Sequence, residues 1–181
     1  MDRVNLAEEL KRNKSILIVI PTQEYSMAIM DLSLQLSNNY SRLAYISMNK
    51  MITPLKRSFE DNDIDVKKFF FIDAITKTAI PNPPSDPNVA FIPAPNDLTK
   101  LSIQITKVLQ TFDPDCIIFD SLSTLLIYED NTITSQFMHS LVNKINAFGI
   151  RAVFTCLNGD KEMQLVRDLS LVVDKVIGGP A

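Results

Sequence analysis

Histidine, cysteine and glycine are scarce in this chain of 181 residues, which has one histidine, two cysteines and four glycines. Cys116 and Cys156 each lie in an apolar run and form neither a metal-binding motif nor a disulfide framework, so we expect two buried thiols. His139 has no second histidine or cysteine at ligand spacing, which argues against a metal site. His139 is also the sole histidine that could serve as the base for a serine or cysteine nucleophile, so we do not expect a hydrolase.

Positive charge and long apolar runs are also limited. The formal net charge is −3 and the isoelectric point is about 5.1, which argues against a nucleic-acid partner because such proteins cluster lysine and arginine. No apolar run approaches the roughly 20 residues that cross a bilayer. The first residues, "MDRVNLAEELKRNK", contain no apolar signal-peptide core. We therefore expect a cytoplasmic protein with no membrane partner and no nucleic-acid partner.

Strand-like and helix-like segments alternate along the chain. Apolar, β-branched runs predict strands at residues 15–20, 42–47, 68–72, 115–119, 150–156 and 171–177. Helical spacing predicts helices at residues 4–12, 26–39, 53–63, 96–112, 132–148 and 159–169, with Asn96 or Asp97 and Asn131 or Thr132 as N-caps. Continuous apolar strands separated by helices predict an α/β fold with a mainly parallel, twisted sheet covered by helices on both faces. The length predicts one domain over residues 1–181.

Two stretches interrupt this regular pattern. Six of the ten prolines fall in residues 81–95, which predicts an irregular surface excursion with a possible short strand at residues 89–92. Three consecutive phenylalanines in "KKFFFIDA", residues 67–74, indicate a strand buried on both faces. If that strand lay at a sheet edge, the same phenylalanines would instead offer a dimer interface.

Polar residues follow several of the predicted strands. Four apolar residues precede Asp120 in "CIIFDSLS", so this carboxylate leaves a buried strand, where it either holds a magnesium shell or caps the next helix. Ligands of parallel sheets bind beyond the carboxyl ends of the strands. The candidate binding residues at these ends are Thr22, Gln23, Ser26, Asp120, Ser121, Thr155 and Asn158. They either converge on one cleft or satisfy turns and helix caps.

The segment "CIIFDSLSTLL" resembles the Walker B segment of KaiC-like members of the RecA superfamily of P-loop ATPases. "RLAYISMNKMITPLKRSFEDNDIDVKKFFFIDA", "NVAFIPAPNDLTKLSIQI", "GIRAVFTCL" and "LVVDKVIG" are similar, in order, to other segments of that family. The resemblance implies a RecA-like, three-layer α/β/α fold in which the sensor strand, residues 150–156, lies beside the Walker B strand. Cys116 and Cys156 would then be separated by roughly 13 Å of strand rise, too far for a disulfide.

The phosphate loop of that family, GxxxxGK[ST], falls on "PTQEYSMA", residues 21–28. Pro21 and Ser26 stand at the two glycine positions. Met27 replaces the lysine and Ala28 the hydroxyl residue, while Glu24 adds negative charge inside the loop. Losing two charge-assisted contacts of about 1.5–3 kcal/mol each would weaken nucleotide binding roughly 10²–10⁴-fold. The resemblance therefore implies a degenerate Walker A loop.

The catalytic position of the family is also changed. KaiC-like ATPases carry adjacent glutamates after the strand that "YIS" resembles, and here Met48 and Asn49 stand there, followed by Lys50. We therefore expect no catalytic residue and no enzyme activity, and a metal at Asp120 only together with a nucleotide. We expect no cofactor, and ATP with magnesium bound weakly if at all.

These observations favour a non-catalytic KaiC-like domain, a pseudo-ATPase that acts through protein contacts in signalling or regulation. Its partner would be a second copy or an intact KaiC-like homologue. The alternatives are an ATP-binding protein with an unorthodox phosphate loop and a domain that binds a small ligand in the former nucleotide cleft. A phospho-accepting receiver domain is disfavoured because Pro21 and Thr22 stand where its acidic cluster belongs.

Overall fold

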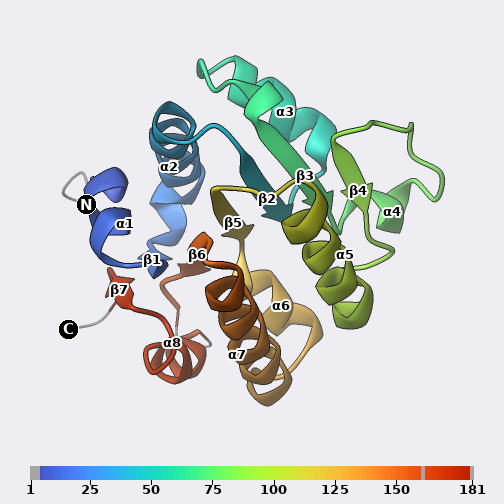
Figure 1. Cartoon of the computed structure of the whole chain (residues 1–181). Coiled ribbons are helices and arrows are strands. Elements are labelled where there is room, and N and C mark those ends of the chain that lie inside the picture. Colours follow the sequence, from blue (N-terminus) through green and yellow to red (C-terminus); the bar gives the residue numbers. More distant parts are fainter. Residues whose placement is uncertain (1–4, 160–161, 180–181) are drawn as a thin grey trace.

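The computed structural model describes residues 5–159 and 162–179, in which seven strands form one parallel sheet (Figure 1). The strand order is β4-β3-β2-β5-β6-β1-β7. The strands are β1 (Ser15–Ile20), β2 (Leu43–Ser47), β3 (Phe69–Asp73), β4 (Val89–Phe91), β5 (Cys116–Asp120), β6 (Arg151–Leu157) and β7 (Lys175–Ile177). The predicted Walker B and sensor strands, β5 and β6, are neighbours.

Helices cover both faces of this sheet (Figure 1). One face carries α1 (Leu6–Arg12), α2 (Tyr25–Asn39) and α3 (Ile52–Glu60). The other carries α5 (Leu98–Thr111), α6 (Leu122–Tyr128), α7 (Asn131–Phe148) and α8 (Met163–Leu169). Shorter helical turns are η1 (Thr22–Glu24), η2 (Val66–Lys68) and α4 (Thr76–Ala79). The predicted three-layer α/β/α fold is confirmed.

Alternate residues of each strand point into two separate hydrophobic cores, one on each face of the sheet. In β5, Cys116 and Ile118 face the α1–α3 layer, whereas Ile117 and Phe119 face the α5–α8 layer. Both faces are therefore apolar, which is why the strands read as continuous hydrophobic runs. Both cysteines are buried and free, as predicted.

The phenylalanines of β3 pack on both faces of the sheet, with Phe69 and Phe71 buried and Phe70 half-buried. Phe69 and Phe71 pack with Phe59 of α3 and Tyr45 of β2, with ring centroids 5.3–6.2 Å apart. Phe70 lies on the opposite face. Because β4 pairs with the outer side of β3, the alternative that β3 forms a sheet edge is wrong.

Side-chain caps explain where two long helices begin. Asp97 accepts a hydrogen bond from the backbone N–H of Lys100 at 3.1 Å, so it is the N-cap of α5, one of the two residues expected. The N-cap of α7 is Asp130, which accepts from the N–H of Ile133 at 2.8 Å. The prediction of Asn131 or Thr132 was therefore wrong by one residue. Gly149 ends α7 with φ of 71°, a left-handed conformation that glycine adopts without strain.

The last predicted strand is shorter than expected. Residues 171–174 are not extended, because the N–H groups of Val172 and Val173 both donate to the carbonyl of Leu169 and continue the end of α8 as turns. Only residues 175–177 pair with β1. Helix α3 likewise ends at Glu60 rather than at residue 63. Residue 4 of the first predicted helix and residues 160–161 of the last lie outside the described residues.

The proline-rich stretch leaves the sheet as predicted. Residues 80–88 form no helix or strand and are mostly exposed, and residues 89–91 return as β4. Lys56 of α3 holds the excursion through an ion pair with Asp86 at 2.6 Å, and its Nζ lies 5.1 Å from the centroid of the Phe71 ring. Over the described residues, the helices are too short or too polar to cross a bilayer.

Candidate functional site

The candidate site lies at the carboxyl edge of the sheet, where the chain leaves β1, β2, β5 and β6. These four strands are consecutive in the sheet, so the loops that follow them gather along one edge. The last residue of β5, Asp120, is fully buried at the centre of this edge. The peptide bond between Asp120 and Ser121 is cis.

Three side chains donate hydrogen bonds to the carboxyl group of Asp120, and we call these four residues the Asp120 cluster. The hydroxyl of Tyr25 donates to Oδ1 and the hydroxyl of Tyr45 to Oδ2. The amide nitrogen of Asn49 lies 3.3 Å from Oδ1 and 3.3 Å from the hydroxyl oxygen of Tyr25. All three donors are uncharged, and they come from the first residue of α2, from β2 and from the loop after β2.

Burial dominates the electrostatics of the Asp120 cluster. It raises the pKa of Asp120 to about 8, because the charged form has lost its water. The three donors favour the ionised form and oppose this shift. Burial also raises the pKa of Tyr45, so its hydroxyl keeps its proton and remains a donor. A carboxyl group that keeps its proton at neutral pH offers little charge to a cation, so Asp120 is a poor metal ligand.

The segment after β1 turns directly into a helix. Residues 22–24 form η1, and α2 follows at Tyr25 without a break. The N–H of Glu24 donates to the carbonyl of Pro21 at 2.9 Å, and the N–H of Tyr25 donates to the carbonyl of Thr22. These N–H groups are therefore committed within the turn. The Tyr25 side chain is only 9% exposed, whereas Met27 is 71% exposed.

The seven predicted site residues divide into two groups. Asp120, Ser121 and Thr155 are buried, and Thr22, Gln23, Ser26 and Asn158 are exposed. Thr155 donates to the carbonyl of Phe119 at 3.1 Å and so ties β6 to β5. Ser121 is the N-cap of α6 but makes no side-chain capping bond. Only Asp120 of the seven belongs to the Asp120 cluster.

Hydrogen bonds hold the loop that carries Asn49. The hydroxyl of Ser47 donates to the carbonyl of Lys50 at 2.6 Å and accepts from its N–H at 3.2 Å. The buried carboxylate of Asp73 accepts from the N–H groups of Ile52, Ile75 and Thr76, which joins the start of α3 to the end of β3. Within residues 5–159 and 162–179, no three histidine, cysteine, aspartate or glutamate side chains gather where one metal ion could be held.

Sequence reasoning missed Tyr25 and Tyr45. A usable signal existed for Tyr45, because β2 and β5 pair with Tyr45 opposite Ile118. Side chains alternate between faces, so Tyr45 and Asp120 share a face and stand one step apart along the strand. Tyr25 carries no such signal, because its side chain direction depends on the turn that η1 makes.

Comparisons with known proteins agree on the fold. A family model described as "Family of unknown function (DUF7504)" matches residues 14–178. No curated protein matches the sequence. Among solved structures, the chain is similar to the KaiC-like protein PH0186 from the hyperthermophilic archaeon Pyrococcus horikoshii OT3, with a TM-score of 0.64. Identity is 11%, and the match covers 90% of this chain and 69% of that one. The similarity shows a KaiC-like, RecA-type fold.

Proposed function

This chain belongs to the DUF7504 family, and we propose that it is a non-catalytic KaiC-like domain that acts through protein–protein contacts in signalling or regulation. One observation carries the proposal: the hydroxyl of Tyr25 donates to the carboxyl of Asp120. In the family that the sequence resembles, the carboxylate at this position holds the magnesium shell of a bound nucleotide. Here a side chain of the protein itself occupies that position.

The turn after β1 supports a degenerate Walker A loop. The family pattern requires two glycines, a lysine and a hydroxyl residue, and the corresponding residues are Pro21, Ser26, Met27 and Ala28. A phosphate cradle needs backbone N–H groups that point at the ligand. Those of Glu24 and Tyr25 donate instead to carbonyls of the same turn. ATP with magnesium would therefore bind weakly if at all, and no cofactor forms part of the proposal.

The loop after β2 supports the absence of catalysis. Met48 and Asn49 stand where KaiC-like ATPases carry their glutamates; Met48 is fully buried, and Asn49 belongs to the Asp120 cluster. Neither side chain can take a proton from water, so the position has no general base.

The partner in this proposal is a second copy of the chain or an intact KaiC-like homologue, met in the cytoplasm. A RecA-type fold without the residues for its chemistry retains a surface through which it can act.

A small uncharged ligand bound at the Asp120 cluster is a second candidate. The side-chain oxygen of Asn49 is buried and has no donor among the described residues. A buried acceptor without a partner costs free energy, and a ligand hydroxyl or amide could satisfy it. This candidate needs no phosphate cradle and no metal.

A thermal-shift series with Mg-ATP, Mg-ADP and Mg-GTP tests the proposal. A ligand at 100 times its Kd stabilises a fold by about 2.7 kcal/mol, so a sub-millimolar site would be obvious. We expect no shift at nucleotide concentrations of about 1 mM. A magnesium-dependent shift below that concentration would overturn the proposal in favour of an ATP-binding protein.

Light scattering tests the protein-contact part. The chain is measured alone and mixed with an intact KaiC-like protein of the same organism. We expect a mass above that of one chain in at least one sample. Monomers in both samples would contradict the partners proposed.

A further inference from the structure

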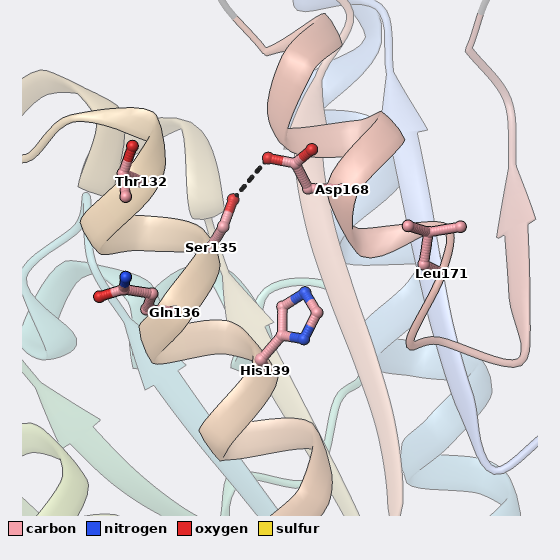
Figure 2. Close-up of a pocket in the computed structure, with 6 residues that line it drawn as sticks. All are labelled: Thr132, Ser135, Gln136, His139, Asp168 and Leu171. Carbon is pink, nitrogen blue, oxygen red and sulfur yellow. Dashed lines mark hydrogen bonds between the residues drawn. The ribbon is translucent and has the colours of Figure 1, made fainter.

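An open cavity of about 500 Å³ lies between α7 and α8, in the α5–α8 layer (Figure 2). Its lining residues are Thr132, Ser135, Gln136, His139, Asp168 and Leu171. This volume falls within the range of roughly 300–1,000 Å³ that small-molecule pockets occupy. No sequence pattern groups these residues, because 29 positions separate His139 from Asp168.

Asp168 is the one acidic side chain among the described residues that line the cavity. One carboxylate oxygen accepts a hydrogen bond from the hydroxyl of Ser135 at 2.9 Å, and the other accepts from the amide of Gln164 at 2.8 Å. Both donors are neutral, so they orient the carboxylate without cancelling its charge. A carboxylate offers about four acceptor positions, and these two bonds leave about two, one on each oxygen. An oriented carboxylate with unused acceptor positions suits a cationic donor.

The remaining lining residues fit the same kind of ligand. Among the described residues, the lining contains no lysine or arginine that would pair with the carboxylate. Figure 2 shows the ring of His139 between α7 and the chain that follows α8, with Leu171 on the far side. The Leu171 side chain is 83% exposed and offers an apolar surface beside the carboxylate. Thr132 and Gln136 add neutral polar groups at the rim.

We propose that the cavity between α7 and α8 binds a small organic cation, a guanidinium or primary ammonium group on a short carbon chain. The cationic N–H groups donate to the unused acceptor positions of Asp168. The carbon chain packs on Leu171, and the imidazole of His139 lies beside it. An anion or a neutral molecule of the same shape lacks the charge-assisted bond.

His139 makes a direct test possible, because it is the only histidine and gives a single set of imidazole signals in an NMR spectrum. The probes are n-butylguanidinium and n-butylammonium, with neutral N-butylurea as the isosteric control. We expect saturable shifts of the imidazole signals with a Kd on the order of 1–10 mM for the cations. N-butylurea should bind at least about tenfold more weakly. Equal shifts with N-butylurea, or no saturable shift up to about 50 mM of either cation, would overturn the proposal.

Asp168→Asn supplies the matched variant, since it removes the charge and keeps the shape. It should weaken binding of n-butylguanidinium at least about tenfold. Glu60→Gln removes the same charge from the opposite helical layer, and it should leave binding unchanged. Unchanged affinity in Asp168→Asn would contradict the proposal. The comparison of cation with urea on the unaltered chain remains decisive if Asp168→Asn fails to fold.

Discussion

Replacing Asp120 with asparagine should remove a pH dependence of folding that this one carboxyl group creates. Burial raises its pKa from 3.8 to about 8, so the folded protein holds a proton there that the unfolded chain releases above about pH 4. The stability that this protonated carboxyl group contributes is fully present below about pH 4 and is lost as the pH rises through 8. Asparagine has the same shape and stays neutral throughout.

The size of the effect follows from the shift. Each pH unit between the two pKa values changes the free energy of unfolding by about 1.4 kcal/mol. From pH 5 to pH 8 the unaltered protein should therefore lose on the order of 4 kcal/mol relative to Asp120→Asn. That is a large share of the roughly 5–15 kcal/mol that holds a typical domain folded.

Urea unfolding followed by circular dichroism at pH 5, 6, 7 and 8 measures this difference. Both proteins share every other titrating group, so their difference isolates residue 120. Glu60→Gln serves as the control, because its exposed side chain meets water in the folded and the unfolded chain alike. A difference that stays constant from pH 5 to 8 would show that Tyr25, Tyr45 and Asn49 keep Asp120 ionised, and our assignment of a neutral carboxyl would be refuted.

Three further substitutions test neighbouring features. Tyr25→Phe removes a donor to a buried carboxyl and should lower the free energy of unfolding by about 1–3 kcal/mol in urea titrations; an unchanged midpoint would contradict the hydrogen bond. Met27→Lys restores only the lysine of the family pattern at an exposed position, so stability should change by no more than about 0.5 kcal/mol and Mg-ATP should still give no thermal shift. Lys56→Ala loses the ion pair to Asp86 and should speed limited proteolysis within residues 80–88 while costing about 1 kcal/mol, and an unaltered cleavage rate would show that the pair does not hold the excursion.

The fold was predictable because most of its strands and helices can be recognised from patterns among neighbouring residues. Continuous apolar runs mark β1, β2, β3, β5 and β6, and each is buried on both faces as a parallel sheet requires. The start of the last strand was predicted wrongly because an apolar sequence pattern favoured a strand where backbone hydrogen bonds form a turn. The apolar residues Leu171 and Val172 suggested a strand, but their segment closes the end of α8.

The candidate site was predictable only in part. Asp120 could be found because a carboxylate after four apolar residues is conspicuous in the sequence. Tyr45 stands in an apolar stretch that reads as core, and it could have been found only from the pairing of β2 with β5. Tyr25 could not be found, because the direction of its side chain depends on the turn that η1 makes. The exposed residues Thr22, Gln23, Ser26 and Asn158 are polar for the ordinary reason that loops face water.

The position of β1 in the sheet has a consequence for synthesis of the chain. Ser15 pairs with Ala152, and Ile16 pairs with Lys175, so a ribosome makes the two neighbours of β1 only 137 and 159 residues after the strand itself. At roughly 5–20 residues per second, β1 waits on the order of ten seconds with both edges unpaired. A nascent chain halted before residue 151 therefore presents an apolar strand that has no native partner to bind, and that chain is a natural client for a chaperone.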